Sequence, residues 1–429
     1  MTKNKIILIF FFLKIYVILA QIYKSCADCD CDDIIKCNDG TLCNGPIDGK
    51  TDQIKKSFIY ISGNQQSNYT YFKDDYSLKW DAIDIIALYG RNYDKRISCL
   101  AHQKKVKVLF NYEETSFCNV FRDPNCTWDL NVIEKQLPRI LTTLQDNNID
   151  GINLDFEVGN RYGEEKQYAF LLKTINDYLK SKNKNYIVSS AIALRYRDNF
   201  KNQIVDVLEN SDYLTIMAYD LNSLQKGSNF TQSPSSPITV RNDLKNFYID
   251  RLPNQYLNKV ILILPYYGYI TKCKRNDNSS YYSNDDNGLL SNECIIDDFK
   301  PRQITYKEID SLVHNKKNNI GININIIINN NNININENEN NIVLSSGTLY
   351  DSKNLTPYSN LIDSNGDRWQ ITFDSPFSIY SKTISIGVGG VGCWSLDKIQ
   401  GLPQSIVDSF YYSIKKENIG NNFILNPYY

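Results

Sequence analysis

Histidine is scarce in this chain, whose 429 residues include only His102 and His314. A zinc site with several histidine ligands and most histidine-dependent catalytic triads are therefore nearly excluded. Charge of one sign is not in excess either, because 47 lysines and arginines balance 48 aspartates and glutamates. A protein that binds nucleic acid needs a basic face, so this balance argues against that class. What remains is carboxylate chemistry on an aromatic-rich scaffold, with 31 tyrosines and 18 phenylalanines.

Long apolar runs are missing beyond the N-terminus. There, two lysines precede two apolar runs, residues 6–13 and 15–20, which Lys14 separates. Neither run reaches the ~20 apolar residues that a membrane span requires. We therefore expect residues 1–20 to be a signal peptide rather than a membrane anchor. The mature protein would then pass through the secretory pathway, to the lysosome or out of the cell, without membrane attachment.

Cysteine, in contrast, is abundant, and the 11 residues fit an oxidising compartment. Five of them crowd into a Cys-rich segment, residues 21–56, where a zinc knuckle is the alternative to disulfides, but no histidine lies nearby. Cys273 and Cys294 are spaced as a local disulfide, as are Cys118 and Cys126. Five N-x-S/T motifs predict a glycoprotein. The crowded cysteines are Cys26, Cys29, Cys31, Cys37 and Cys43, and the motif asparagines are Asn68, Asn125, Asn229, Asn278 and Asn354.

Short runs rich in isoleucine and valine alternate with amphipathic stretches along the rest of the chain. Such runs, bounded by asparagine, aspartate or glycine, are typical of buried parallel strands. Eight of them predict a (β/α)8 barrel over residues 57–416. An open doubly wound sheet is the alternative, but it usually has a glycine-rich turn after an early strand, and none is present there. The predicted strands are 58–62, 83–89, 106–111, 149–156, 186–194, 213–220, 260–269 and 384–394, and predicted helices include 130–147, 162–182 and 304–314.

Two segments depart from this alternation. Residues 318–341 are dominated by asparagine and isoleucine, and such low complexity predicts a disordered loop between helix 7 and strand 8. An insertion there leaves the barrel intact, because the entropy of loop closure grows slowly with loop length. Residues 417–429 form a C-terminal tail.

The richest motif is the sequence Asp-Gly-Ile-Asn-Leu-Asp-Phe-Glu at residues 150–157. Side chains alternate across a strand, so Asn153, Asp155 and Glu157 share one face, which in a barrel is the interior. Polar and acidic groups are costly to bury there without a function, and active sites of such barrels lie at the carboxyl ends of the strands. A solvated surface strand is the alternative, but the apolar residues on the opposite face argue against it.

Three other predicted strands end in aromatic and polar residues. Met217, Tyr219 and Asp220 end the sixth strand, Tyr266 lies near the end of the seventh, and Trp394 ends the eighth. Each aromatic residue alone is more often part of a core than of a ligand site. Together with the acids they predict a flat apolar floor with carboxylates above it, which suits a sugar ring.

These motifs resemble those of family 18 of the glycoside hydrolases, the chitinase-like enzymes. Residues 150–157 are similar to the strand-four signature of the family, residues 217–220 resemble its M-x-Y-D motif, and Trp394 matches its strand-eight tryptophan. The resemblance spans the whole predicted barrel and implies the same fold. One departure is Asn153, because most members have aspartate there, and another is Phe-Asn-Tyr at residues 110–112, where the family usually has a glycine-rich end of strand three.

The chain also resembles the chitobiase-like members of that family. They share the Cys-rich start, the pair Trp80-Asp81, the run from Cys99 to His102, and asparagine at position 153. This resemblance implies a hydrolase that cuts GlcNAc-β-1,4-GlcNAc linkages in chitooligosaccharides or in the chitobiose core of degraded N-glycans. We expect a monomer whose partner is an oligosaccharide containing N-acetylglucosamine. His102 itself is expected to be structural.

The resemblance further implies a retaining, substrate-assisted mechanism that needs no metal or organic cofactor. Glu157 would protonate the leaving oxygen and later activate water. Asp155 would accept a hydrogen bond from the acetamido N–H of the substrate, and Tyr219 would bind the acetamido oxygen. The residues expected to bind the substrate are Trp394, Asn153, Asp220, Met217 and Tyr266.

Two other functions stay open. The barrel could carry an endo-acting chitinase or endo-β-N-acetylglucosaminidase, which would cut internal rather than terminal linkages. It could also carry a non-catalytic lectin that binds chitooligosaccharides. Lectins of this fold usually lack the acid at the position of Glu157, so its presence argues against the lectin function.

Overall fold

The computed structural model describes residues 29–32, 45–49, 55–90, 93–113, 130–156, 164–196, 203–221, 231–274, 294–297, 301–314, 342–351, 354–384 and 387–414. The predicted signal peptide (residues 1–20), the asparagine-rich loop (318–341) and the C-terminal tail (417–429) lie outside these ranges. So does the cysteine pair Cys118 and Cys126.

The described chain contains the predicted barrel of parallel strands. Its strands are β1 (Lys56–Ile61), β2 (Ile85–Leu88), β3 (Lys107–Glu113), β4 (Gly151–Asp155), β5 (Ile187–Ala193), β6 (Tyr213–Met217), β7 (Val260–Pro265) and β14 (Gly390–Trp394). They close in the order β1-β14-β7-β6-β5-β4-β3-β2. Parallel pairing of β3 with β4 and of β4 with β5 sets Asn111, Asn153 and Ser189 opposite one another. The (β/α)8 prediction is confirmed.

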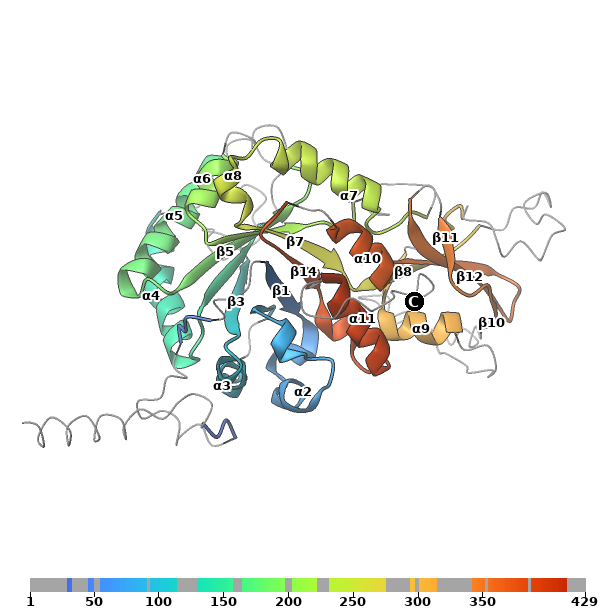
Figure 1. The fold of residues 1–429 in the computed structure, drawn as a ribbon, viewed down its shortest axis with the longest axis horizontal. Coiled ribbons are helices and arrows are strands. Elements are labelled where there is room, and N and C mark those ends of the chain that lie inside the picture. The colour runs from blue at the N-terminus through green and yellow to red at the C-terminus, as the bar shows by residue number, and fades with distance from the viewer. Residues whose placement is uncertain are drawn as a thin grey trace, which may run out of the picture. The chain divides into compact units, whose positions relative to one another are not determined.

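Contacts divide the chain into two compact units, one of Met1–Ile192 with Tyr196–Thr215 and the other of Ala193–Arg195 with Ile216–Tyr429. The described residues of the first unit form five α-helices, which lie outside the strands (Figure 1). They are α2 (Tyr69–Asp74), α3 (Lys95–Gln103), α4 (Leu130–Asp146), α5 (Glu164–Lys182) and α6 (Ile204–Glu209).

The amphipathic pattern of α4 and α5 explains how they cover the strands. One face of α5 is fully buried, and it consists of Tyr168, Leu171, Leu172, Ile175 and Leu179. The Tyr168 hydroxyl lies 2.5 Å from the Ser190 hydroxyl of β5. On α4 the buried residues are Ile133, Leu137, Ile140 and Leu144, spaced three or four residues apart. The helices therefore form where the 3.6-residue period predicts them.

The second unit contains the remaining α-helices of the described chain and a π-helical turn. They are α7 (Pro237–Leu244), a π-helical turn (Lys245–Ile249), α8 (Asn254–Leu257), α9 (Tyr306–His314), α10 (Pro376–Thr383) and α11 (Gln404–Ile414). The prediction of a helix at 304–314 is confirmed with a later start, at a capping box in which the Thr305 amide donates to Glu308 Oε2 at 2.7 Å. No helix within the described ranges combines the length and apolarity needed to cross a bilayer.

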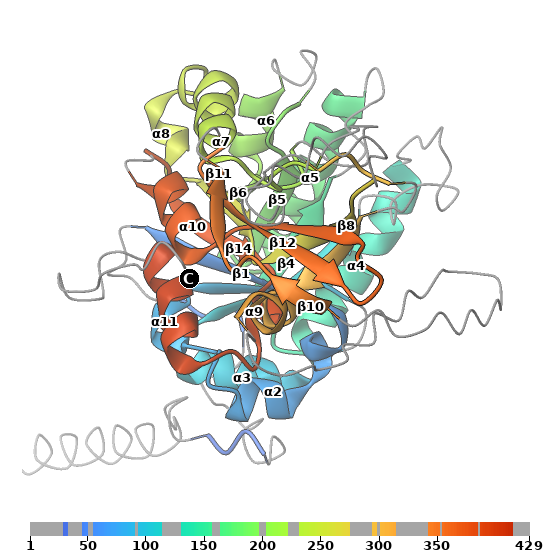
Figure 2. The same ribbon diagram turned by 90° about the vertical axis from the view of Figure 1, so that its right-hand side faces the viewer.

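An antiparallel sheet, inserted between β7 and β14, was not predicted. Its strands are β8 (Tyr267–Lys272), β9 (Arg302–Thr305), β10 (Ile342–Ser345), β11 (Leu349–Asp351), β12 (Thr356–Asp363) and β13 (Arg368–Phe373). Five pair in the order β10-β12-β13-β8-β9, and β11 pairs with β12 (Figure 2). The prediction of one strand at 260–269 is wrong, because the chain leaves the barrel at Tyr266 and continues as β8 in the other sheet. Likewise, only 390–394 of the predicted strand 384–394 is β14, and residues 315–383 contain more than a loop.

Three aspartates join consecutive strands of the first unit at their amino ends. Asp84, Asp150 and Asp212 each directly precede an even-numbered strand. The carboxylate of each accepts a backbone N–H of the preceding strand, from Ser57 at 2.8 Å, from Val108 at 2.7 Å and from Val188 at 2.8 Å. In return, the backbone N–H of each aspartate donates to the carbonyl of its partner, Ser57, Val108 or Val188 respectively. Each aspartate therefore links its own strand to the preceding one through two hydrogen bonds.

Asp150 also fastens the N-terminal segment to the barrel. Its Oδ1 accepts the Ile47 amide at 2.7 Å, and its Oδ2 lies 2.9 Å from His102 Nε2, with both side chains fully buried. A disulfide between Cys31 and Cys99 ties the same segment to α3. His102 is structural, as predicted, and the predicted disulfide between Cys273 and Cys294 is confirmed.

We predict that Asp150→Ala lowers the free energy of unfolding by about 3 kcal/mol, because it leaves the buried donors of Val108 and His102 and the half-buried amide of Ile47 without their acceptor. Urea denaturation followed by circular dichroism measures this change. As the matched control, Asp177→Ala removes an aspartate whose ion pair with Lys173 is more than half exposed, and we expect a change within about 0.5 kcal/mol. Equal effects of the two substitutions would contradict the assigned role of Asp150.

Candidate active site

Strand β4 directs Asn153 and Asp155 into the barrel, as the alternation of its side chains predicts. Asn153 is fully buried and Asp155 is 7% exposed. Asn153 Nδ2 donates to Asn111 Oδ1 at 2.7 Å, and Ser189 Oγ donates to Asn153 Oδ1 at 2.7 Å. On the opposite face, Phe156 stacks on Tyr168 of α5 with ring centroids 4.0 Å apart. Both faces of β4 are therefore fixed, one by hydrogen bonds and one by packing.

Tyr60 of β1 joins this polar group from across the interior of the first unit. Its hydroxyl lies 2.9 Å from the Thr215 hydroxyl of β6. Burial raises the pKa of Tyr60, hydrogen bonds with Thr215 and Asn153 act against this rise, and the negative charge of Asp155 adds to it. Tyr60 therefore remains a neutral hydrogen-bonding group at physiological pH.

Glu157, the predicted acid, lies outside the described residues, which stop at Phe156 and resume at residue 164.

The second unit carries the other predicted site residues, grouped around Asp220. Asp220 Oδ1 accepts hydrogen bonds from the Tyr267 hydroxyl at 2.9 Å and from the Tyr269 hydroxyl at 3.0 Å. The Tyr219 ring lies 6.2 Å from the Tyr267 ring in an edge-on arrangement, and 6.4 Å from the Trp394 ring at an interplanar angle of 19°. Aromatic faces and a carboxylate, the two features that sugar binding requires, thus occur side by side.

The backbone and the charge of Asp220 are both unusual. Its φ of 53° lies in the left-handed region, which few residues other than glycine adopt. Burial raises the pKa of its carboxyl, and the hydrogen bonds from Tyr267 and Tyr269 offset part of this rise. The carboxyl therefore keeps its proton to a higher pH than an exposed aspartate does.

The remaining two predicted residues differ in their placement. Met217, at the end of β6, is half-buried. Tyr266 is 1% exposed, its ring packs 4.6 Å from the Phe410 ring, and its hydroxyl donates to the Phe410 carbonyl at 3.2 Å. The structure therefore places Tyr266 in the core, while the adjacent Tyr267 contacts Asp220.

Sequence reasoning missed the hydrogen-bonding partners of both groups. Asn111 and Ser189 lie opposite Asn153 in neighbouring strands, and their inward parity is visible in the sequence once the strands are aligned. The sequence predicts one strand through Tyr266, Tyr267 and Tyr269, but β7 ends at Pro265 and β8 begins at Tyr267. Within the described residues, no group of histidine, cysteine, aspartate or glutamate side chains could hold a metal ion.

Comparison with known proteins gives a consistent result. Residues 50–398 match the family described as glycosyl hydrolases family 18. Di-N-acetylchitobiase of Mus musculus is 22% identical over 399 residues, which are 90% of this chain and 90% of that protein.

Solved structures show the same fold. A chitinase from Chromobacterium violaceum superposes with a TM-score of 0.55 at 15% identity, over 84% of this chain and 98% of that one. A family 18 N-acetylglucosaminidase from Paenibacillus barengoltzii gives a TM-score of 0.56 at 13% identity, over 84% of this chain and 100% of that one.

We predict a pH-dependent effect of Asp220→Asn on stability. In the folded state the pKa of Asp220 is raised above 3.8. This group therefore makes its full contribution to the free energy of unfolding below about pH 3.8, and that contribution is lost as the pH rises through the folded pKa. The asparagine variant does not titrate, so its free energy of unfolding relative to the wild type should increase across that window and then level off. Urea denaturation at a series of pH values measures it. A difference that does not change with pH would refute the raised pKa of Asp220.

Proposed function

Since the chain belongs to family 18 of the glycosyl hydrolases, we propose that it hydrolyses GlcNAc-β-1,4-GlcNAc linkages by a retaining, substrate-assisted mechanism. The proposed substrates are chitooligosaccharides and the chitobiose core of degraded N-glycans. The observation that carries the proposal is the buried hydrogen-bonded strand β4, which directs Asp155 inward and precedes Glu157.

The proposal assigns the chemistry to three residues. Glu157 donates a proton to the leaving oxygen, and the acetamido oxygen of the substrate attacks the anomeric carbon to form an oxazolinium ion. Asp155 accepts the acetamido N–H and stabilises the positive charge of that ion. The Tyr219 hydroxyl donates a hydrogen bond to the acetamido oxygen. Glu157, now a carboxylate, then takes a proton from the water that opens the ring, so the configuration is retained.

Further residues would bind the sugar. Trp394 offers an indole face, and the Tyr219 ring lies nearly parallel to it. Asp220 has a second carboxyl oxygen besides the one that accepts from Tyr267 and Tyr269. Asn153 would set the orientation of β4 rather than exchange protons, because an amide does not titrate. Met217 and Tyr266 would support these groups from the ends of β6 and β7.

The chitobiase-like reaction is favoured over the endo-acting one by similarity along most of the chain. The mouse relative named di-N-acetylchitobiase is similar over 399 residues, which are 90% of this chain. The disulfides Cys31–Cys99 and Cys273–Cys294 support passage through the secretory pathway, where oxidising conditions preserve them. We propose the lysosome as destination, with secretion as the alternative.

The decisive experiment is mass spectrometry of the products from N-acetylated chitooligosaccharides of defined length at acidic pH. Release of single N-acetylglucosamine residues from one end supports the proposal. Internal cuts support an endo-acting chitinase or endo-β-N-acetylglucosaminidase. Binding of folded protein without any cleavage would support the lectin function and refute hydrolysis.

We predict that Glu157→Gln lowers kcat by at least ~100-fold, because the amide can neither donate nor accept the proton that the mechanism requires. The dissociation constant for N,N′,N″-triacetylchitotriose should change by less than about threefold, since the amide has nearly the same shape. Initial rates and isothermal titration calorimetry measure the two quantities.

The control for this prediction is Glu134→Gln, on the exposed face of α4. It makes the same chemical change away from the proposed site, and its kcat should equal that of the wild type. If Glu157→Gln retained kcat within a factor of two, or lost binding as well, Glu157 would not be the acid.

A further inference from the structure

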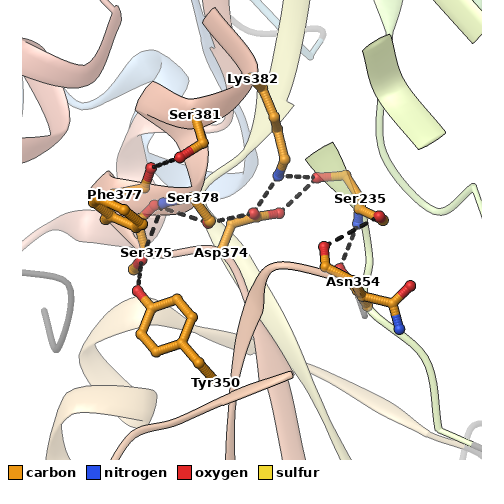
Figure 3. A network of polar contacts seen from close by, with 11 residues as sticks. Ser235, Tyr350, Asn354, Asp374, Ser375, Phe377, Ser378, Ser381 and Lys382 are labelled. Carbon is orange, nitrogen blue, oxygen red and sulfur yellow. Dashed lines mark hydrogen bonds and ion pairs between the residues drawn. The ribbon is translucent and has the colours of Figure 1, made fainter. Parts of the chain in front are cut away.

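A buried charged network lies at the end of β13 in the second unit (Figure 3). Lys382, Asp374 and Ser235 have no solvent exposure. Lys382 Nζ contacts Asp374 Oδ1 and donates to Ser235 Oγ at 2.6 Å, while Ser235 Oγ donates to Asp374 Oδ2 at 2.6 Å. Ser378 Oγ donates to Asp374 Oδ1 at 2.6 Å. The network therefore joins the end of β13, helix α10 and the segment at 231–236.

Such a network is a poor device for stability alone. Burial lowers the pKa of Lys382, and the adjacent carboxylate of Asp374 acts against this. The free energy lost by removing two charges from water is often not recovered, and well-packed apolar residues can replace a buried ion pair without loss of stability. What a fully hydrogen-bonded pair does provide is a fixed mutual geometry for the segments that carry it. Groups bonded to the segments around Ser235 and Asp374 depend on that geometry.

One connection runs from Ser235 to Asp220. The residue before Ser235 is Pro234, whose carbonyl accepts the Leu221 amide at 3.2 Å. Leu221 directly follows Asp220, the residue with the left-handed φ of 53°. The hydrogen bond from the Ser235 hydroxyl to Asp374 therefore holds the segment that contains Pro234, and Pro234 in turn binds the backbone of Leu221.

A second connection runs from Asp374 to the tyrosines that bind Asp220. Asp374 directly follows Phe373, which pairs with Gly268 of β8, and Thr372 pairs with Tyr269. At Gly268 a Cβ atom would lie 2.7 Å from the Thr372 carbonyl oxygen and 2.8 Å from Phe373 Cβ, so the two strands approach closely there. Tyr267 and Tyr269, on either side of Gly268, donate to the Asp220 carboxylate.

We propose that the network of Lys382, Asp374 and Ser235 positions Asp220 for the reaction, by fixing both the backbone that follows it and the tyrosines that bind it. These three are positioning residues, because they act through others and touch no substrate. The catalytic part of this inference rests on the proposed function. The geometric part does not, and it can be measured without a substrate.

The test compares two serines that donate to the same carboxylate. Ser235→Ala and Ser378→Ala each remove one fully buried hydroxyl with a hydrogen bond of 2.6 Å to Asp374. Only Ser235 leads to the segment that binds the Leu221 amide. The other contacts of Ser378 are with Ser375, at the start of the same helix.

The first readout is amide hydrogen exchange of Leu221, resolved by mass spectrometry with electron-transfer fragmentation. We expect Ser235→Ala to speed exchange about fivefold, the change that loss of one hydrogen bond produces in a local opening equilibrium. Ser378→Ala should change it by less than about twofold. If both variants, or neither, speed the exchange, the positioning role is refuted. Should Ser235→Ala fail to fold, Ser235→Cys keeps a weaker donor at the same place and should give a smaller increase that Ser378→Cys does not.

The second readout is the separate effect on kcat and on KM with N,N′,N″-triacetylchitotriose as substrate. Ser235→Ala should lower kcat about tenfold at a KM within about twofold of the wild type, because misplacement of Asp220 affects the transition state more than the bound substrate. Ser378→Ala should match the wild type. Equal loss in both variants would indicate general destabilisation and overturn the inference. If wild-type protein cleaved no substrate, the proposed function would fail, while the exchange measurement would still decide whether the network positions Asp220.

Discussion

A polar side chain inside a barrel is stable only if groups on the adjacent strands satisfy its hydrogen bonds, and Asn153 depends on this constraint. Its amide donates to Asn111 on one side and accepts from Ser189 on the other. The parallel register of β3, β4 and β5 sets these three residues opposite one another, so the backbone ladder determines the orientation of the amide. Asp155, two residues further along β4, shares that face. The direction of the carboxylate therefore follows from strand register.

The barrel could be predicted from the sequence because its strands are buried on both faces. Continuous runs such as Val260–Pro265 can lie only between a packed interior and covering helices, so composition and length identify them. The same reasoning failed for β12 and β13, whose buried residues include Asn360 and Gln370. Gln370 Nε2 donates to Asn360 Oδ1 at 2.9 Å. Each strand alone looks too polar to be buried, and only pairing with its partner resolves this.

The site shows the same division. The facing of Asn153 and Asp155 follows from alternation within one strand and was predictable. The partners of Asp220 were not, because the prediction ran β7 and β8 together as one strand and selected Tyr266. The chain changes sheet at that residue, and a change of direction in a run of tyrosines leaves no hydrophobic signal. Long-range pairing with β13 decides which tyrosines turn toward Asp220.

The two kinds of aspartate in this chain illustrate how stability and function separate along a strand. Asp84 and Asp150 accept backbone N–H groups at the amino ends of the strands, where each carboxylate satisfies a donor that would otherwise be buried. Asp220 follows the carboxyl end of β6 with a left-handed backbone and a buried carboxyl, and both features oppose folding. Such a residue persists only where its surroundings hold it, here two tyrosine hydroxyls and the bonded backbone of Leu221. An unfavourable conformation maintained by several other groups is typical of a functional position, because stability alone would select a residue without these costs.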